Sequence, residues 1–323
     1  VAGTKSVVIH RNTVDVRAQS QPFSALAVNV ILGTTGSGVV TNNSIALAVG
    51  HTACAGIAIS FATAGLDTAT AVRNATLTLE GNNVTMFGDP ALRGPSGFSS
   101  STDAFAVQVF LAARNRPDVW LKSMRIENNT ITARNEHRNG AWSALGIAFG
   151  AHNDVTVERN TITAVAPHHP SGDVTHAALY LWLLGTCGVN PAGCFGPNGT
   201  VTTARVQHNR ISATYELDGA AVAFYNNATE GLQLDVTEND IATNASAFAF
   251  KPAAATRPAE QLHALIRNNT VAFDPVRSNL FATFWTWPVP GNVSIVGNMV
   301  GTNTDVALNS FLAVSTTATP LPL

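Results

Sequence analysis

The sequence predicts an all-β solenoid, in which one structural unit repeats and stacks along the chain. Two observations carry this prediction. A short motif, apolar-x-x-Asn-x-(Ile/Val), recurs along the chain with a base period near 30 residues, and Ile126–Ile131 is a clear copy. Apolar and polar residues also alternate around the copies. A fixed period with a few longer steps is typical of a repeat architecture that carries loop insertions.

The motif occurs nine times, and its fourth position is Asn in every copy. Successive asparagines are separated by 31, 39, 47, 31, 49, 30, 30 and 29 residues, so three steps contain insertions. The copies are Ile9–Val14, Val40–Ile45, Leu79–Val84, Ile126–Ile131, Val157–Ile162, Val206–Ile211, Val236–Ile241, Ile266–Val271 and Ile295–Val300. Their asparagines are Asn12, Asn43, Asn82, Asn129, Asn160, Asn209, Asn239, Asn269 and Asn298.

The residues around each motif have the pattern of strands. The segment Val155–Val165 alternates apolar and polar residues and is rich in Val, Ile and Thr, which indicates strand rather than helix. Each coil divides into a strand before the Asn, a strand after it, and a third strand beyond a variable loop. The predicted third strands are Phe105–Ala112, Ser143–Phe149, Ala177–Leu184, Ala220–Tyr225, Ser246–Lys251, Leu280–Trp287 and Ala307–Val314.

The recurring Asn marks a turn between the first two strands of a coil. Asn is unfavourable within strands but tolerates left-handed and bridging backbone conformations, so we expect it to adopt one of these at the turn. Stacking the coils places the asparagines above one another. Because each side-chain amide has two donors and two acceptors, neighbouring amides can form a hydrogen-bonded ladder along the stack.

This pattern resembles the right-handed parallel β-helix family with the pectate-lyase-like fold, whose coils carry an Asn ladder at one turn. The resemblance covers most of the chain and implies a single domain over residues 1–314, followed by a Thr- and Pro-rich tail or linker over residues 315–323. Nine coils stacked at strand spacing would form a rod on the order of 40 Å long.

Composition and charge exclude several classes of partner. The formal net charge is −2 and only 12% of residues are charged, so no basic patch predicts nucleic-acid binding. The uncharged stretch between Arg17 and Asp67 is long enough for a membrane span over Ile45–Leu66. It contains glycines and a histidine and divides into two strand-like runs, so buried strands are the better interpretation and no membrane span is predicted.

Three cysteines and several glycosylation sequons point toward the cell exterior. Cys187 and Cys194 lie in a Gly/Pro-rich loop where a disulfide would indicate an oxidising compartment, whereas Cys54 lies in an apolar strand. Sequons at Asn42, Asn128 and Asn268 follow from the repeat itself. Further sequons lie at Asn74 and Asn83, and the predicted glycosylation candidates are Asn198, Asn227, Asn244 and Asn292.

The third strands contain almost no charge, Lys251 being the exception up to Trp287. Since alternate residues of a strand face opposite sides, both faces of this sheet must be largely apolar. Two interpretations follow: the sheet is covered on both faces, or it exposes an apolar strip to a partner. Its aromatic residues are candidates for an interface or for stacking against sugar rings: Tyr180, Trp182, Tyr225, Trp285 and Trp287.

The densest titratable cluster is His168, His169, Asp173 and His176, in a loop between two strands. Such a group can serve in acid–base chemistry or hold a metal, but a polar loop between two prolines is the preferred interpretation. The motifs of polygalacturonase-like enzymes are absent except for Asn303-Thr304-Asp305, a tripeptide expected by chance. No metal site and no cofactor are predicted.

Two function classes remain. The first is an extracellular or cell-surface structural or adhesion protein that assembles with itself, as an oligomer or filament, or binds another surface protein through the apolar sheet. The second, implied by the family resemblance, is a carbohydrate-active enzyme, a polysaccharide lyase or glycosidase acting on a polysaccharide through the 166–176 loop. The scarcity of charge on the third strands favours the first class.

Overall fold

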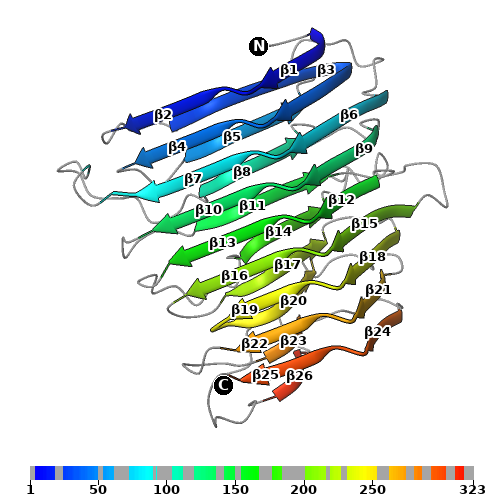
Figure 1. Cartoon of the computed structure of the whole chain (residues 1–323). Helices are drawn as coiled ribbons and strands as arrows, with labels where there is room; N and C mark the ends of the chain where they lie inside the picture. The colour runs from blue at the N-terminus through cyan, green and yellow to red at the C-terminus, as the bar shows by residue number, and fades with distance from the viewer. Residues whose placement is uncertain are drawn as a thin grey trace.

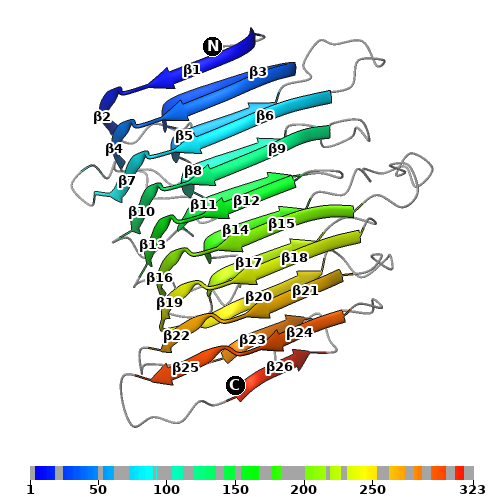
Figure 2. The same cartoon turned by 45° about the vertical axis from the view of Figure 1, so that its right-hand side comes forward.

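The structure is a parallel β-helix in which nearly every described residue belongs to a strand. It is a computed structural model that describes residues 4–18, 25–49, 54–61, 73–89, 92, 104–111, 120–135, 142–149, 154–166, 177–183, 201–215, 219–226, 231–252, 262–273, 280–285, 292–302 and 310–315. The chain winds right-handedly, and its first and last strands lie at opposite ends of the stack (Figures 1 and 2). The predicted fold class is therefore confirmed.

Three series of parallel strands form the walls of the solenoid. The first sheet contains the strands before each Asn: β1 (Thr4–His10), the second half of β3 (Ala25–Thr41), β6 (Arg73–Glu80), β9 (Trp120–Glu127), β12 (Asp154–Glu158), β15 (Val201–Gln207), β18 (Gly231–Thr237), β21 (Leu262–Arg267) and β24 (Asn292–Val296). The second sheet contains the strands after it: β2 (Thr13–Ala18), β4 (Ser44–Val49), β7 (Asn83–Gly88), β10 (Thr130–Asn135), β13 (Thr161–Ala166), β16 (Arg210–Tyr215), β19 (Asp240–Thr243), β22 (Thr270–Phe273) and β25 (Met299–Thr302).

The third sheet closes each coil and runs back across the far side of the solenoid. It contains the first half of β3, β5 (Cys54–Phe61), β8 (Ala104–Leu111), β11 (Trp142–Phe149), β14 (Ala177–Leu183), β17 (Ala220–Asn226), β20 (Ser246–Pro252), β23 (Leu280–Trp285) and β26 (Ser310–Ser315). Strand β3 is 17 residues long and joins the two sheets, since Ala25–Leu32 pairs with β5 while Ser37–Thr41 pairs with β6.

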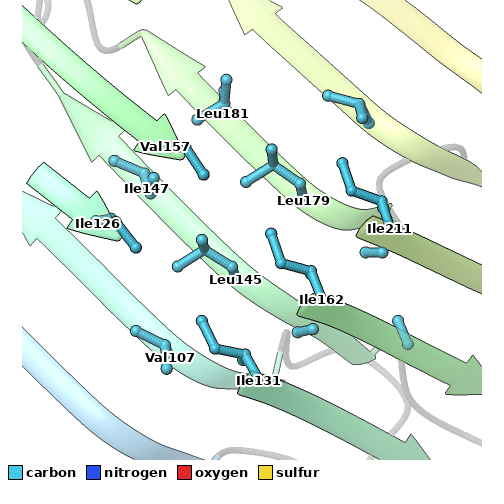
Figure 3. Packing of buried hydrophobic residues seen from close by; sticks show 14 of the residues in the cluster. Val107, Ile126, Ile131, Leu145, Ile147, Val157, Ile162, Leu179, Leu181 and Ile211 are labelled. Atoms are coloured by element: carbon cyan, nitrogen blue, oxygen red, sulfur yellow. The ribbon is translucent and has the colours of Figure 1, made fainter. Parts of the chain in front are cut away.

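The core is built from columns of apolar side chains that stack from coil to coil. Register aligns Ile131, Ile162 and Ile211 in the second sheet, and all three are buried. Figure 3 shows this column facing Leu145 and Leu179 of the third sheet across the interior. The alternation of exposed and buried residues in each strand thus supplies one face to the core and one to the outside.

These strands decide between the two interpretations of the uncharged stretch, which were a membrane span and buried strands. The uncharged stretch forms β4 and β5, whose inward residues are buried in the common core, and no helix among the described residues is long and apolar enough to cross a membrane. Strands of the solenoid extend from Thr4 to Ser315. Residues 316–323 of the predicted tail lie outside the described part of the chain.

Candidate functional surfaces

The turn between the first and second sheets has the same backbone conformation in every coil. At each turn the residue immediately before the ladder Asn has a positive φ, between 54° and 66°, and not the Asn itself, as the sequence had suggested. We call these nine positions the left-handed column: Arg11, Asn42, Gly81, Asn128, Arg159, His208, Glu238, Asn268 and Gly297. Gly and Asn adopt this conformation readily, whereas Arg, His and Glu do so at a cost.

The side chain of each ladder Asn points inward and links one coil to the next. In a typical step, the backbone N–H and Nδ2 of Asn129 both donate to Oδ1 of Asn160, each at 2.9 Å. Nδ2 of Asn129 also donates to the backbone carbonyls of Leu79 and Glu127. The same donation from one Asn to the next occurs at all eight steps from Asn12 to Asn298.

The ladder therefore satisfies buried polar groups where the main chain leaves a strand. The asparagines from Asn43 to Asn269 are at most 3% exposed, so an unpaired amide at any of them would carry the full cost of desolvation. All nine predicted ladder residues are confirmed, and their role is structural.

Part of the outer face of the third sheet is buried: most described outward side chains from β8 to β20 are covered, whereas Asn29 is exposed and Ala58, Gln108 and Tyr180 are partly buried. The outward residues Ala177, Ala220, Ala223 and Ala249 form a small apolar cluster separate from the main core, and Tyr180 packs against it half-buried. These strands match the interpretation of a sheet covered on both faces. Among their described side chains, no large apolar residue is exposed.

One close contact on this outer face explains why residue 146 is a glycine. The ring of Phe105 lies over Gly146, because a Cβ added at Gly146 would come within 2.3 Å of the ring. The same ring lies 6.4 Å from that of Tyr180, centroid to centroid. Phe105, Gly146 and Tyr180 come from three successive coils, so this packing ties β8, β11 and β14 together on the outside of the sheet.

The other predicted aromatic residues are placed in part. Trp182 and Tyr225 are register partners on β14 and β17, and Trp285 ends β23. Only the backbone of these three residues is described, and Trp287 lies outside the described residues. Whether these rings bind a partner or a sugar stays a prediction.

A face that sequence reasoning missed lies on the outside of the first sheet and its turn. We call it the charged face; its ion pairs are Arg125–Glu127 at 2.7 Å, Arg159–Glu158 at 3.0 Å and Arg205–Asp154 at 2.6 Å. The Arg205–Asp154 pair joins residues 51 apart in sequence. Only the coil register brings these two residues together, so this pair could not be found from the local sequence.

Three carboxylates stack within the charged face. Register aligns Glu80, Glu127 and Glu158 in one outward column, at a strand spacing of about 4.8 Å. Like charges at this spacing repel each other, and Arg125 offsets the repulsion. Its hydrogen bond to Glu127, together with the Coulombic attraction of all three carboxylates, raises the pKa of Arg125 above its ordinary value.

The loop candidates cannot be placed. His168, His169, Asp173 and His176, the cysteines Cys187 and Cys194, and the sequon residues Asn198 and Asn227 lie outside the described residues. Asn292 begins β24, with only its backbone described. Within the described part of the chain, no group of three or more His, Cys, Asp or Glu is arranged to hold a metal ion.

Asn244 has a hydrogen-bonding role that its sequon does not reveal. Its Oδ1 accepts from the backbone N–H of Tyr215 at 2.9 Å, and its Nδ2 donates to the carbonyl of the same residue at 2.7 Å. The side chain thus continues the pairing of β16 by one step. Nδ2 is the atom that a glycan would occupy, so glycosylation would compete with this bond.

The two end coils expose apolar side chains. Among the described residues, the large hydrophobic side chains classed as exposed are Val8 in β1, and Val293, Val296 and Met299 in β24 and β25. Val8 lies in the first coil and the other three in the last (Figures 1 and 2). Where side chains are described, the large exposed apolar residues therefore lie in the end coils of the solenoid.

Comparison with models of protein families, with curated proteins and with solved structures finds no match to this chain. The architecture identifies the chain as a parallel β-helix, and its function has to be argued from its own surfaces.

Proposed function

We propose that this protein is an extracellular or cell-surface structural or adhesion protein, in which the solenoid acts as a rigid rod that associates with copies of itself or with another surface protein. The observation that carries the proposal is the position of the exposed apolar residues. Val8, Val296 and Met299 are 55–68% exposed, and all lie in the end coils. Exposed apolar side chains beside open strand edges are typical of association surfaces.

The scaffold supports a structural role. Every step along the rod is fixed by main-chain pairing in three sheets and by the buried Asn ladder. Such a solenoid transmits force through hydrogen bonds shared between coils, and each coil contacts only its neighbours.

Solution mass tests the proposal. Light scattering over a range of concentrations, with negative-stain images of the same samples, should detect oligomers or filaments. A protein that stays monomeric at high concentration, and that fails to bind surfaces of the cells that produce it, would contradict the proposal.

A second candidate is a carbohydrate-active enzyme of the pectate-lyase-like class, which the Asn ladder resembles. The charged face favours it, because Glu127 and Glu158 project from adjacent coils with Arg125 and Arg159 beside them. Glycoside hydrolysis uses a pair of carboxyl groups on either side of the scissile bond. A screen of polysaccharides tests this candidate. Activity that Glu127→Gln and Glu158→Gln both abolish, without loss of thermal stability, would establish it over the structural role.

The predicted location has its own tests. A free-thiol count on the native protein, before and after reduction, would show whether Cys187 and Cys194 form a disulfide. Peptide mass analysis after glycosidase treatment would show whether Asn198, Asn227, Asn244 or Asn292 carries a glycan. Three free thiols and unmodified sequons would contradict an oxidising, glycosylating compartment.

A further inference from the structure

The core columns of the first sheet run from the first coil to the last, and Val293 at the last coil is 40% exposed whereas Val7 at the first coil is buried. One inward column begins at Val7 and, coil by coil, ends at Val293. Ile9 and Ile295 are likewise the two ends of one column of the first sheet, and both are only partly buried. A further coil placed against either end would continue these columns with residues of the same kind.

The Asn ladder is unfinished at both ends, in opposite senses. At the first coil, Asn12 donates to Asn43, but no described residue donates to its own Oδ1. At the last coil, Asn298 accepts from Asn269, but no described residue accepts from its backbone N–H. One end therefore offers an acceptor and the other a donor, spaced as they are within the ladder.

The last coil also departs from the outward pattern beside the turn. In the two outward columns that flank the turn, the first eight coils have polar residues throughout. The column before the turn holds His10, Thr41, Glu80, Glu127, Glu158, Gln207, Thr237 and Arg267, and ends in Val296. The column after it holds Thr13, Ser44, Asn83, Thr130, Thr161, Arg210, Asp240 and Thr270, and ends in Met299.

We propose that the last coil of one molecule stacks on the first coil of a second copy, so that the sheets and the Asn ladder continue from one molecule into the next. This inference rests on the proposed function and specifies the surfaces through which two copies associate. In the joint, the backbone N–H of Asn298 donates to Oδ1 of Asn12 in the second copy. Val296 then lies in the column of His10 of that copy, diagonal to its Val8, at the distance over which cross-strand side chains still contact.

This contact is head-to-tail and does not close on itself. Because the two surfaces differ, each added copy leaves one new first coil and one new last coil open, and the product is a filament. Each added copy lengthens the rod by about 4.8 Å per coil and leaves the width of the rod unchanged.

The test uses the whole chain with charges placed at the joint. In Val296→Arg/Met299→Arg, both columns receive a residue type that they already hold at Arg267 and Arg210, so the coil should still fold. The matched control Gln207→Arg/Thr270→Arg puts the same charges in the same two columns of inner coils, at positions that are not buried. Circular dichroism and thermal unfolding of both variants verify folding.

We expect light scattering and negative-stain images to show the unaltered protein and the control as unbranched filaments of constant width. The Val296→Arg/Met299→Arg variant should remain monomeric. It should also shorten filaments of the unaltered protein when added at low ratio, because its first coil still binds an open last coil. Side-by-side aggregates that the variant also forms would overturn the joint but leave a self-associating rod in place. A strictly monomeric unaltered protein would overturn the joint and count against self-association altogether.

Discussion

At the residue scale, the ladder Asn and the residue before it have different roles in each turn. The Asn supplies buried hydrogen bonds, and the preceding residue absorbs the left-handed backbone conformation. The chain uses Asn or Gly at five of the nine left-handed positions. The sequons at Asn42, Asn128 and Asn268 therefore have a conformational cause, since Asn is the non-glycine residue that best tolerates this backbone.

An inner ladder residue should matter far more than an end one. Asn160→Ala removes the acceptor for two donors of Asn129 and leaves the carbonyl of Ile126 without its side-chain donor. At about 1–3 kcal/mol for each buried group left unpaired, the loss should be about 3 kcal/mol or more. Asn12→Ala, at an exposed end, should cost less than about 1 kcal/mol in urea unfolding. Equal losses at the two positions would argue against the ladder as the source of stability.

The left-handed column contains residues whose replacement by glycine should stabilise the protein. Arg159 has a φ of 54°, and its side chain is 55% exposed, so we expect its ion pair with Glu158 to contribute little. Arg159→Gly should raise the unfolding free energy by about 0.5–1 kcal/mol. The control Arg210→Gly, within strand β16, should lower it by a similar amount. A destabilised Arg159→Gly protein would show that its side chain does more than fill the turn.

Tyr215 should make stability fall at high pH. Burial raises the pKa of its hydroxyl well above the ordinary value, so the folded protein holds this proton while the unfolded chain releases it near pH 10. Its contribution is fully present below pH 10 and is lost as pH rises, by about 1.4 kcal/mol per pH unit. Urea midpoints between pH 8 and 11 should therefore fall more steeply for the unaltered protein than for Tyr215→Phe. Parallel curves would exclude Tyr215 as the cause.

At the element scale, the strands could be predicted closely from the sequence and their outer contacts could not. Inward residues repeat in kind, as Ile131, Ile162 and Ile211 do, so alternation and period located both strands and core. The left-handed residues vary from Gly to Arg because the neighbouring coils impose their conformation. The charged face and the apolar end pair Val296 and Met299 become visible only when residues from separate coils are aligned in register.

The packing of Phe105 on Gly146 gives a test at this scale. Gly146→Ala places a methyl group where the ring lies, and should cost about 1–3 kcal/mol. Gly301→Ala is the matched control, because nothing lies within 4 Å of its added Cβ. In a Phe105→Leu background the cost of Gly146→Ala should fall, giving a measurable coupling in a double-mutant cycle of unfolding free energies. Additive losses would mean that the ring moves aside freely.

At the scale of the whole molecule, each coil depends on its neighbours and not on distant parts of the chain. Deleting residues 240–269 removes one 30-residue interval of the ladder, including Asn269. Asn239 is then followed directly by Thr270, and its side chain takes the place of Asn269 against Asn298. The inward residues brought together, such as Ile211 and Val271, already share one column. The shortened chain should therefore keep a β-rich circular dichroism spectrum and unfold cooperatively.

A deletion of half a coil is the control for this experiment. Removing residues 240–254 deletes β19 and β20 but keeps the first-sheet strand β21 that follows them. The ladder is then out of phase and first-sheet strands face third-sheet strands, so this chain should not fold. If both deletions fold equally well, the phase of the repeat does not determine the stack.

The uniform direction of the ladder gives it a dipole moment along the axis of the rod. Every side-chain amide in the column is oriented alike, with its N–H toward the next coil and its oxygen toward the preceding one, from Asn12 to Asn298. Their dipoles add along the axis and polarise one another. The ladder therefore contributes a permanent dipole along the axis of the rod, with its positive end toward the last coil, and this contribution favours antiparallel over parallel side-by-side neighbours.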